Sequence, residues 1–197
     1  LNDIARSAFI KKQVKDTSTE TVNALVKHIR SGNFLPREYE LRIAHGRVDR
    51  VDTFEDGNNI YVKVIDYKSG NKVFNVTETF LGLQMQLMVY LKDTVDYIKK
   101  NNPDKNVYPA AGLYFHVYDP YVSEIDCEKA VSDFRKNNPD SELSDEELKK
   151  MAIEKERFKA YRMSGLVAKE IEIVNAMDHD TITKTGSSAI LPVNITK

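Results

Sequence analysis

The chain is poor in the features that hold extracellular or membrane proteins together. It has a single cysteine among 197 residues, which excludes an internal disulfide and a metal cluster held by cysteines alone. No stretch approaches the roughly 20 apolar residues that a membrane span needs, and no signal peptide is present. We therefore expect a protein of the reducing cytoplasm that makes no contact with a membrane.

A surplus of basic charge is also missing. The formal net charge is -1 and the pI is about 6.5, which argues against a general nucleic-acid coat. Any contact with DNA would have to come from a local patch. Hydrophobic residues make up 41% of the chain and charged residues 30%, which is typical of a soluble globular domain with a real core.

The chain is expected to be one domain cut from a larger protein. It starts at Leu1 without a methionine, and residues 189–195 have the pattern of an unfinished strand. The expected single domain has four consecutive parts: N-terminal helices (1–36), a catalytic core (37–120), a helical insertion (121–165) and a truncated C-terminal segment (166–197).

Apolar spacing and capping signals predict the secondary structure. Thr17 and Glu20 have capping-box spacing, which predicts that a first helix over 3–15 is followed by a second one ending at Gly32. The other expected elements are, in order, an extended segment over 39–43 continuing through Gly46 into a strand to Phe54, a strand over 60–68, a helix cap at 75–78, a buried helix over 80–91, a strand over 107–118, and a helix from the Ser144–Glu147 capping box to Gly165. The intervening residues 121–143 show no clear pattern. This order predicts an α/β fold with a central mixed β-sheet flanked by helices.

Two aspartates are expected to face each other across a β-hairpin. Residues 55–59 are a strong turn signal, and a hairpin centred on Gly57–Asn58 places Asp49 opposite Asp66, with Cβ atoms about 5 Å apart. The same register gives two further pairs, Asp52 with Lys63 and Val51 with Val64. Facing carboxylates repel unless a cation lies between them, and a divalent metal ion is the obvious candidate. A bulge would shift this register.

Such a pair suits the hydrolysis of a phosphodiester bond. Mg²⁺ prefers hard oxygen ligands and keeps several waters, and Asp49, Asp66 and a backbone carbonyl such as that of Tyr67 could supply part of its ligands. Lys68 lies two residues after Asp66 and therefore on the same face of the strand. Its ammonium could hold the attacking water or offset charge on the phosphate.

Other side chains have both a functional and a plainer interpretation. Gln86 and Tyr90 are four residues apart on one side of the expected helix and could bind the water or a phosphate oxygen, but such pairs more often pack in the core. The two aspartates and the lysine could equally form a salt-bridge network in an ordinary α/β domain. His45 is the only histidine kept as a candidate ligand, and Cys127 is interpreted as an inert thiol.

Three motifs that occur in order carry a family resemblance: Gly46–Asp52, Val64–Gly70 and Gln84–Leu91. They resemble motifs II and III and the Q-x-x-x-Y motif of the RecB-type PD-(D/E)XK nucleases. Among these, the similarity is to the nuclease domain of AddB-type subunits of ATP-dependent helicase–nucleases. Two later segments, Tyr161–Val167 and Ala176–Asp178, are also similar to AddB-type domains, more weakly.

The resemblance implies a restriction-endonuclease-like fold and hydrolysis of DNA that depends on Mg²⁺, with Mn²⁺ as a possible substitute. The DNA strand would be delivered by a helicase during double-strand break repair and recombination, in a complex with an AddA-type helicase–nuclease subunit. By motif match, Asp49 and Asp66 would bind the metal and Lys68 would assist the water. Gln86 and Tyr90 would complete the site.

Two features of the family are missing from the sequence. A further metal ligand, commonly a histidine upstream of motif II, has no clear equivalent, because His28 and His45 are badly placed. The iron–sulfur cluster of AddB-type domains is held by one upstream and three downstream cysteines, and Cys127 fits neither location. We therefore expect the cluster in the full-length protein but not in this fragment, with an incomplete metal site and weak or absent activity of the fragment alone. Two rivals remain, a Cas4-like exonuclease of the same fold and a catalytically inactive nuclease fold that binds DNA as a scaffold.

Overall fold

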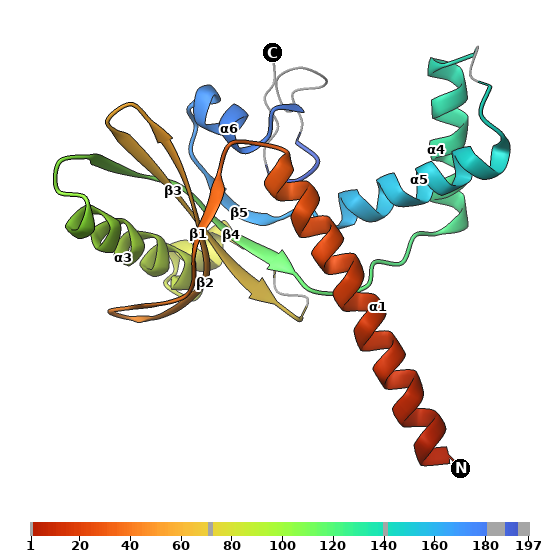
Figure 1. The fold of residues 1–197 in the computed structure, drawn as a ribbon, viewed down its shortest axis with the longest axis horizontal. Helices are drawn as coiled ribbons and strands as arrows, with labels where there is room; N and C mark the ends of the chain where they lie inside the picture. Colours follow the sequence, from red (N-terminus) through yellow and green to blue (C-terminus); the bar gives the residue numbers. More distant parts are fainter. Residues whose placement is uncertain (1, 71–72, 140–141, 181–187, 193–197) are drawn as a thin grey trace.

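The structure is built on one five-stranded sheet with helices against its faces (Figure 1). The computed structural model describes residues 2–70, 73–139, 142–180 and 188–192. In chain order, its elements are α1 (Asn2–Arg30), β1 (Leu35–Ile43), β2 (Gly46–Asp56), β3 (Asn59–Lys68), α2 (Val76–Phe80), α3 (Gln86–Asn101), β4 (Asn106–His116), α4 (Glu124–Asn137), α5 (Asp145–Ala160), β5 (Ser164–Val167) and α6 (Ile171–Met177). No helix in these ranges is long and apolar enough to cross a membrane.

The sheet is mixed, as the element order predicted. The strand order is β1-β2-β3-β4-β5; β3 and β4 run parallel, and the other neighbouring strands are antiparallel. The parallel pair brings the carboxyl ends of β3 and β4 to one end of the sheet, where Lys68 and His116 are register partners. Because register partners share a face, His116 lies on the same face as Lys68 and Asp66.

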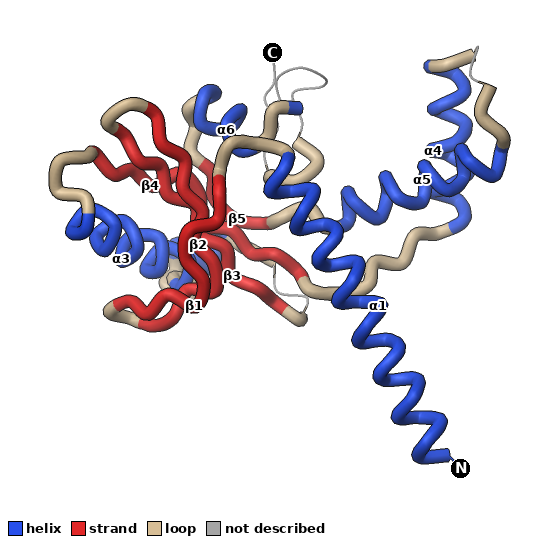
Figure 2. The backbone as a smooth tube through the Cα atoms, viewed as in Figure 1, coloured by secondary structure: helices blue, strands red, loops and turns tan. Residues whose placement is uncertain are grey.

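Apolar clusters form on both faces of the sheet. One face packs against α3, with Val64 of β3 and Ile98 of α3 in the same cluster. The other face packs against the C-terminal part of α1 and against α6, with Ala24, Phe115 and Val174 in one cluster. Figure 2 shows the strands between α3 on one side and α1 and α6 on the other. The two faces therefore place different side chains in different surroundings.

The N-terminal region forms one helix, which corrects the expectation of two. The hydroxyls of Ser18 and Thr19 each donate to the carbonyl four residues earlier, at 2.7 and 2.9 Å. These side chains bond back to the preceding turn instead of capping a new one, so α1 continues through Thr17–Glu20 without a break. Its buried residues recur at helical spacing only in the last third: Thr21, Ala24 and His28.

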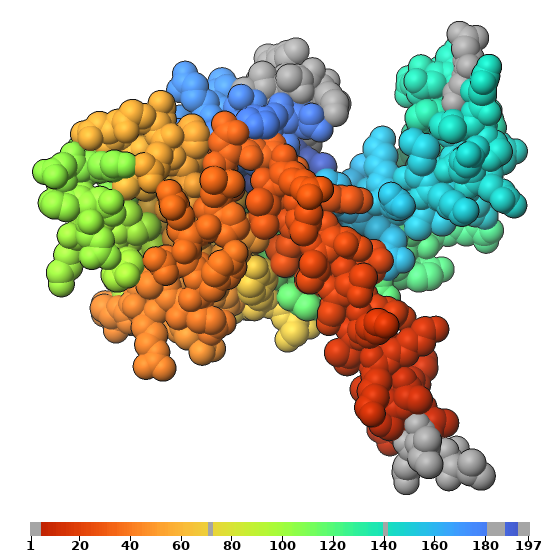
Figure 3. All heavy atoms as spheres, in the orientation of Figure 1, coloured from red at the N-terminus to blue at the C-terminus, as the bar shows by residue number. Residues whose placement is uncertain are grey.

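Two parts of the chain project away from the sheet. The N-terminal half of α1 extends from the body, and the α4–α5 pair forms a separate arm (Figure 3). Residues 5–16 of α1 are all exposed. Neither part therefore shapes the surroundings of the sheet end where β3 and β4 finish, except through the C-terminal end of α5.

Turns divide two segments that were expected to be continuous. A turn at Ala44–His45 separates β1 from β2, and Gly46, with a φ of 151°, follows it. The helix expected over 80–91 begins only at Gln86, because the short α2 ends before it and Gly82, with a φ of 80°, turns the chain between them. The apolar run over this stretch is thus part helix and part exposed turn.

Two of the expected capping signals outside the sheet are confirmed. The Asn75 side chain accepts hydrogen bonds from two N–H groups in the first turn of α2, and Ser144 and Glu147 form the expected capping box of α5. Residues 121–143, which show no pattern in the sequence, contain α4. Cys127 is the buried residue of that helix, which explains why no apolar stripe marked it.

Two expected boundaries near the C-terminus are wrong. Helix α5 ends at Ala160, and Gly165 lies in β5, where an added Cβ would come within 2.1 Å of the Gly112 carbonyl oxygen. Of the strand expected over 189–195, residues 189–192 form bends and the rest falls outside the described residues.

Candidate active site

The β2–β3 hairpin has the register that its turn predicted. The ladder runs from the turn to Arg50 opposite Ile65. It contains both further expected pairs, Asp52 with Lys63 and Val51 with Val64. The ladder stops one residue short of the expected Asp49–Asp66 pair, so these two aspartates lie just past its end.

Asp49 lies at an irregularity in β2. Val48 and Val51 both pack in the cluster on the α3 face, although residues three apart on a regular strand face opposite sides. The alternation of β2 is therefore broken between them. The Asp49 carboxylate accepts a hydrogen bond from the backbone N–H of Tyr67, with Oδ2 and N 2.7 Å apart. This bond ties Asp49 to the residue that follows Asp66.

Asp66 and Lys68 form an ion pair at the end of β3. Lys68 Nζ is 2.5 Å from Asp66 Oδ2, and the two side chains are 21% and 5% exposed. The same Nζ lies 5.2 Å from the centre of the Tyr114 ring. Burial, together with the charge of Asp66, raises the pKa of Tyr114. A buried carboxylate, an ammonium and an aromatic ring thus share one region of the α3 face.

Helix α3 brings Gln86 and Tyr90 to this ion pair. Gln86 Oε1 accepts from Lys68 Nζ at 3.3 Å, and Gln86 Nε2 lies 3.5 Å from Asp66 Oδ1 and 3.0 Å from the Tyr90 hydroxyl. Tyr90 also lies against the turn before β2, because a Cβ added to Gly46 would be 2.9 Å from its hydroxyl oxygen. The structure therefore brings Asp66, Lys68, Gln86 and Tyr90 into contact, and it ties Asp49 to Tyr67, the residue that follows Asp66.

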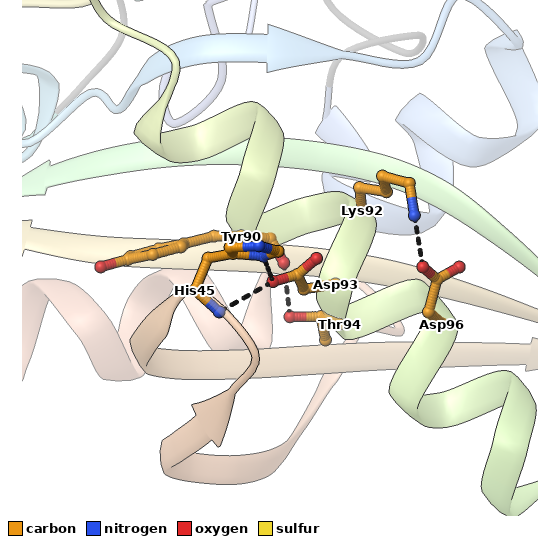
Figure 4. Close-up of polar contacts among 6 residues, drawn as sticks. All are labelled: His45, Tyr90, Lys92, Asp93, Thr94 and Asp96. Atoms are coloured by element: carbon orange, nitrogen blue, oxygen red, sulfur yellow. Dashed lines mark hydrogen bonds and ion pairs between the residues drawn. The ribbon is translucent and has the colours of Figure 1, made fainter.

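His45 contacts α3 and not the aspartates. Its Nδ1 is 2.7 Å from Asp93 Oδ2, and its backbone N–H donates to the same oxygen at 3.2 Å. The hydrogen bond to His45 lowers the pKa of Asp93. Figure 4 shows this contact beside Tyr90, whose carbonyl accepts from the Thr94 hydroxyl at 2.7 Å. His45 thus fastens the β1–β2 turn to α3 next to a residue of the site.

The opposite face of the same strands carries a buried charge network that the sequence analysis missed. Arg50 donates to both carboxylate oxygens of Asp52, at 2.6 and 2.7 Å, and Lys63 Nζ lies 2.9 Å from Asp52. All three side chains are buried. Burial lowers the pKa of Lys63, and the charge of Asp52 opposes this effect. The cross-strand Asp52–Lys63 pair was the available signal, but nothing in its spacing showed that it would be buried.

His28 of α1 lies near this network. Its side chain is 6% exposed, and both ring nitrogens lack a hydrogen-bond partner among the described residues. The ring packs edge-on against Phe115 and Phe158. Burial, with the nearby charges of Lys63 and Arg50, lowers the pKa of His28 to about 3. It is a neutral core histidine on the face of the sheet away from the aspartate pair.

The donor set at the end of β3 fits a hard divalent cation that is bound by few protein ligands. Asp49 and Asp66 could contribute carboxylate oxygens, and their role as ligands, like that of the Tyr67 carbonyl, stays a prediction. Within the described ranges, no group of three or more His, Cys, Asp or Glu side chains could hold a metal ion. A cation bound here would therefore keep several waters, as Mg²⁺ does. Cys127 is buried in α4 and belongs to no such group.

Two aspartates, a lysine, a glutamine and a tyrosine lie at or beside the end of β3, where the nuclease motifs predicted a site. The chain matches the model of the PD-(D/E)XK nuclease superfamily over residues 2–182, and it belongs to this family. The restriction-endonuclease-like α/β fold expected from the motifs is thereby confirmed.

Within this family, the chain is similar to AddB-type subunits. The chain is 32% identical to an ATP-dependent helicase/deoxyribonuclease subunit of Clostridioides difficile (strain 630), over 100% of this chain and 17% of that protein. It is 31% identical to the subunit of the same name from Thermoanaerobacter sp. (strain X514), again over 100% and 17%. For the subunit of Alkaliphilus oremlandii (strain OhILAs) the identity is 32%, over 98% and 16%. The chain thus spans about a sixth of the length of these relatives.

Proposed function

We propose that this domain hydrolyses DNA phosphodiester bonds in a Mg²⁺-dependent reaction, for which Mn²⁺ can substitute. It would act as the nuclease domain of an AddAB-type helicase–nuclease in double-strand break repair and recombination. The observation that carries the proposal is that Gln86 contacts Lys68, Asp66 and Tyr90 at the strand end where Asp49 is fastened. The names of the relatives support DNA as the substrate and an AddA-type helicase as the partner.

The chemistry follows from which groups each side chain can offer. A bound Mg²⁺ would supply Lewis-acid stabilisation of charge on the phosphate, and the carboxylates of Asp49 and Asp66 would hold it. The Lys68 ammonium can donate a hydrogen bond to the attacking water, because it lies beside Asp66 at the strand end. Gln86 keeps that ammonium oriented through its Oε1, and Tyr90 in turn orients the Gln86 amide.

Substitution of the ion pair tests the proposal in the full-length protein bound to its helicase partner. Asp66→Ala and Lys68→Met should each reduce DNA digestion by more than about 100-fold, because each removes a group preorganised against developing charge. ATP-dependent unwinding should persist. The two strands of the duplex are labelled separately, since an AddA-type partner would carry a nuclease of its own. Only one strand should escape digestion.

A matched control lies on α3. Lys92 and Asp96 form an exposed ion pair there, with side chains 74% and 64% exposed (Figure 4). Lys92→Met and Asp96→Ala make the same chemical changes away from the aspartates and should leave digestion within about twofold. If Asp66→Ala also leaves digestion of both strands intact, the domain is an inactive scaffold and the proposal is wrong.

The Cas4-like alternative is less well supported. It would share the fold and the same aspartates and lysine, so the site alone does not separate the two. The names of the relatives combine a helicase with a deoxyribonuclease in one protein, which favours the AddAB-type assignment. DNA digestion that requires ATP-dependent unwinding would support the AddAB-type assignment. Digestion that is independent of ATP would favour the Cas4-like alternative.

A further inference from the structure

A cleft of about 430 Å³ opens at the end of the sheet beyond Lys68. We call it the strand-end cleft. Lys68 and His116, the last residues of β3 and β4, line it together with Tyr118, Arg162 and Ser164. Because Lys68 also belongs to the candidate active site, whatever occupies this cleft lies next to the lysine that pairs with Asp66.

The strand-end cleft differs in its charge from four other clefts among the described residues. Its lining residues include Lys68, His116 and Arg162 but no aspartate or glutamate. Four other clefts among the described residues each contain carboxylates, for example Glu20, Asp133, Glu170 and Glu55. In a chain with 30 acidic and 29 basic residues, a cleft lined by Arg162 and Lys68 without a carboxylate of its own suits the local basic contact that DNA binding requires.

Aromatic and imidazole rings in the cleft are held in place. The Tyr118 hydroxyl donates to the Ala160 carbonyl at 2.7 Å, and the ring is 38% exposed. His116 Nδ1 lies 2.8 Å from the Gly70 carbonyl, so Nδ1 carries the hydrogen of the neutral ring, in which Nε2 is an acceptor. The two rings meet edge-on, with centroids 6.5 Å apart. Fixed ring faces beside cationic groups are the pattern with which proteins bind single-stranded nucleic acid.

The fixed position of Arg162 adds a phosphate-binding group. Its Nε donates to the Leu191 carbonyl at 2.7 Å, which anchors the guanidinium between α5 and β5 while the residue remains exposed. A guanidinium presents several donors in a planar fork that suits phosphate oxygens.

We propose that the strand-end cleft binds the single-stranded DNA segment flanking the phosphate that is cleaved. Arg162 contacts a backbone phosphate, Nε2 of His116 accepts a hydrogen bond from a base N–H group, and a base stacks on Tyr118. This inference rests on the proposed nuclease function and names the path by which the strand reaches Lys68.

Binding without metal separates this proposal from the proposed chemistry. The 197-residue chain is titrated against a fluorescein-labelled single-stranded oligonucleotide in EDTA, and anisotropy is followed over a range of KCl concentrations. Arg162→Gln should weaken binding about tenfold and reduce the slope of log K against log [salt] by about 0.7, because one phosphate contact on a single strand is lost. Arg162→Lys should restore the slope.

The aromatic contact has a different signature. Tyr118→Leu should weaken binding about tenfold without changing the salt slope, because stacking is not ionic, and Tyr118→Phe should restore the affinity. Arg37→Gln is the matched control, since Arg37 is 60% exposed and pairs with Glu55 in a cleft that contains carboxylates; its binding should stay within about twofold of wild type.

Each outcome bears on one proposal. The proposal that the strand-end cleft binds single-stranded DNA is wrong if Arg162→Gln and Tyr118→Leu both keep wild-type affinity. It is also wrong if the wild-type chain does not bind the oligonucleotide. If Arg162→Gln does not fold, His116→Asn and Tyr118→Leu carry the test. Digestion that survives Asp66→Ala in the full-length complex overturns the nuclease proposal instead, and leaves the binding result to stand alone.

Discussion

Lys63 lies 2.9 Å from Asp52 in the interior of the protein, on the face of the hairpin opposite the candidate active site. Arg50 shares the same carboxylate, so two buried cations depend on one buried anion. The network lies directly behind the strand ends that hold Asp49 and Asp66. It therefore supports the hairpin from the side away from the site.

Removal of the shared anion is expected to destabilise the protein strongly. Asp52→Asn keeps the size of the side chain but leaves Arg50 and Lys63 without a counter-charge, which should cost about 3–5 kcal/mol in the free energy of unfolding. Urea unfolding measures this value. Asp56→Asn, an exposed position on the same strand, should cost less than about 0.5 kcal/mol. A similar small loss in both variants would contradict the role of the network.

Metal binding should stabilise the folded chain only while Asp49 is ionised. At a Mn²⁺ concentration about 100 times the dissociation constant, the free energy of unfolding should rise by about 2.7 kcal/mol. Asp49→Asn keeps an oxygen that can accept from the Tyr67 N–H but removes the charge, and the Mn²⁺ effect should disappear. Thermal unfolding with and without Mn²⁺ reports it. An undiminished effect in Asp49→Asn would show that the metal binds elsewhere.

His28 should make the protein less stable in mild acid. The pKa of His28 is lowered from 6.5 to about 3 in the folded state. Between pH 6.5 and pH 3, the His28 imidazole is therefore protonated in the unfolded chain but not in the folded chain. Stability is therefore fully present above pH 6.5 and falls towards pH 3. By pH 5 the loss relative to pH 8 should be about 2 kcal/mol. His28→Leu should remove this part of the pH dependence, and urea unfolding of both proteins at pH 5 and pH 8 measures it.

Two glycines with nearly equal φ angles should respond differently to alanine. Gly165 has a φ of 149° and Gly46 a φ of 151°, but a Cβ at Gly165 would meet the backbone of Gly112, whereas at Gly46 it would meet the movable Tyr90 ring. We expect Gly165→Ala to cost at least about 3 kcal/mol. Gly46→Ala should cost about 1–2 kcal/mol and lower nuclease activity by displacing Tyr90.

Urea unfolding and DNA digestion check both glycine variants. Gly57→Asn serves as the reference, because its φ of 55° suits asparagine and an added Cβ meets nothing within 4 Å. Equal losses of stability in Gly46→Ala and Gly165→Ala would contradict the distinction between a side-chain and a backbone neighbour.

Local signals were sufficient for the centre of the site. The turn at Gly57–Asn58 fixes which residues face each other, because a short hairpin leaves little freedom of register, and the ladder follows that register as far as Arg50. The i, i+4 spacing of Gln86 and Tyr90 placed both on one side of α3 for the same local reason. The family motifs then connected these separate pieces in the correct order.

Features that depend on distant packing could not be predicted. The Asp49–Tyr67 hydrogen bond lies at the irregularity between Val48 and Val51, and both valines pack in the cluster that contains Ile98 of α3, far along the chain. Helix α1 continues through Thr17–Glu20 because hydroxyls at such a sequence can either cap a new helix or donate to the carbonyl of the preceding turn. The strand-end cleft is lined by the ends of β3 and β4 and by Arg162. These residues are far apart in the sequence, so no short-range pattern could predict that they lie together.

The outer part of the long N-terminal helix α1 has little packing to stabilise it. At about 1.5 Å per residue, the 29 residues of α1 reach about 44 Å, yet the residues that anchor it, such as Ala24 and His28, all lie in its last third. An unsupported stretch of this length is only marginally helical in water. Packing against the sheet therefore does not stabilise the outer end of this helix, whose residues 5–16 are all exposed.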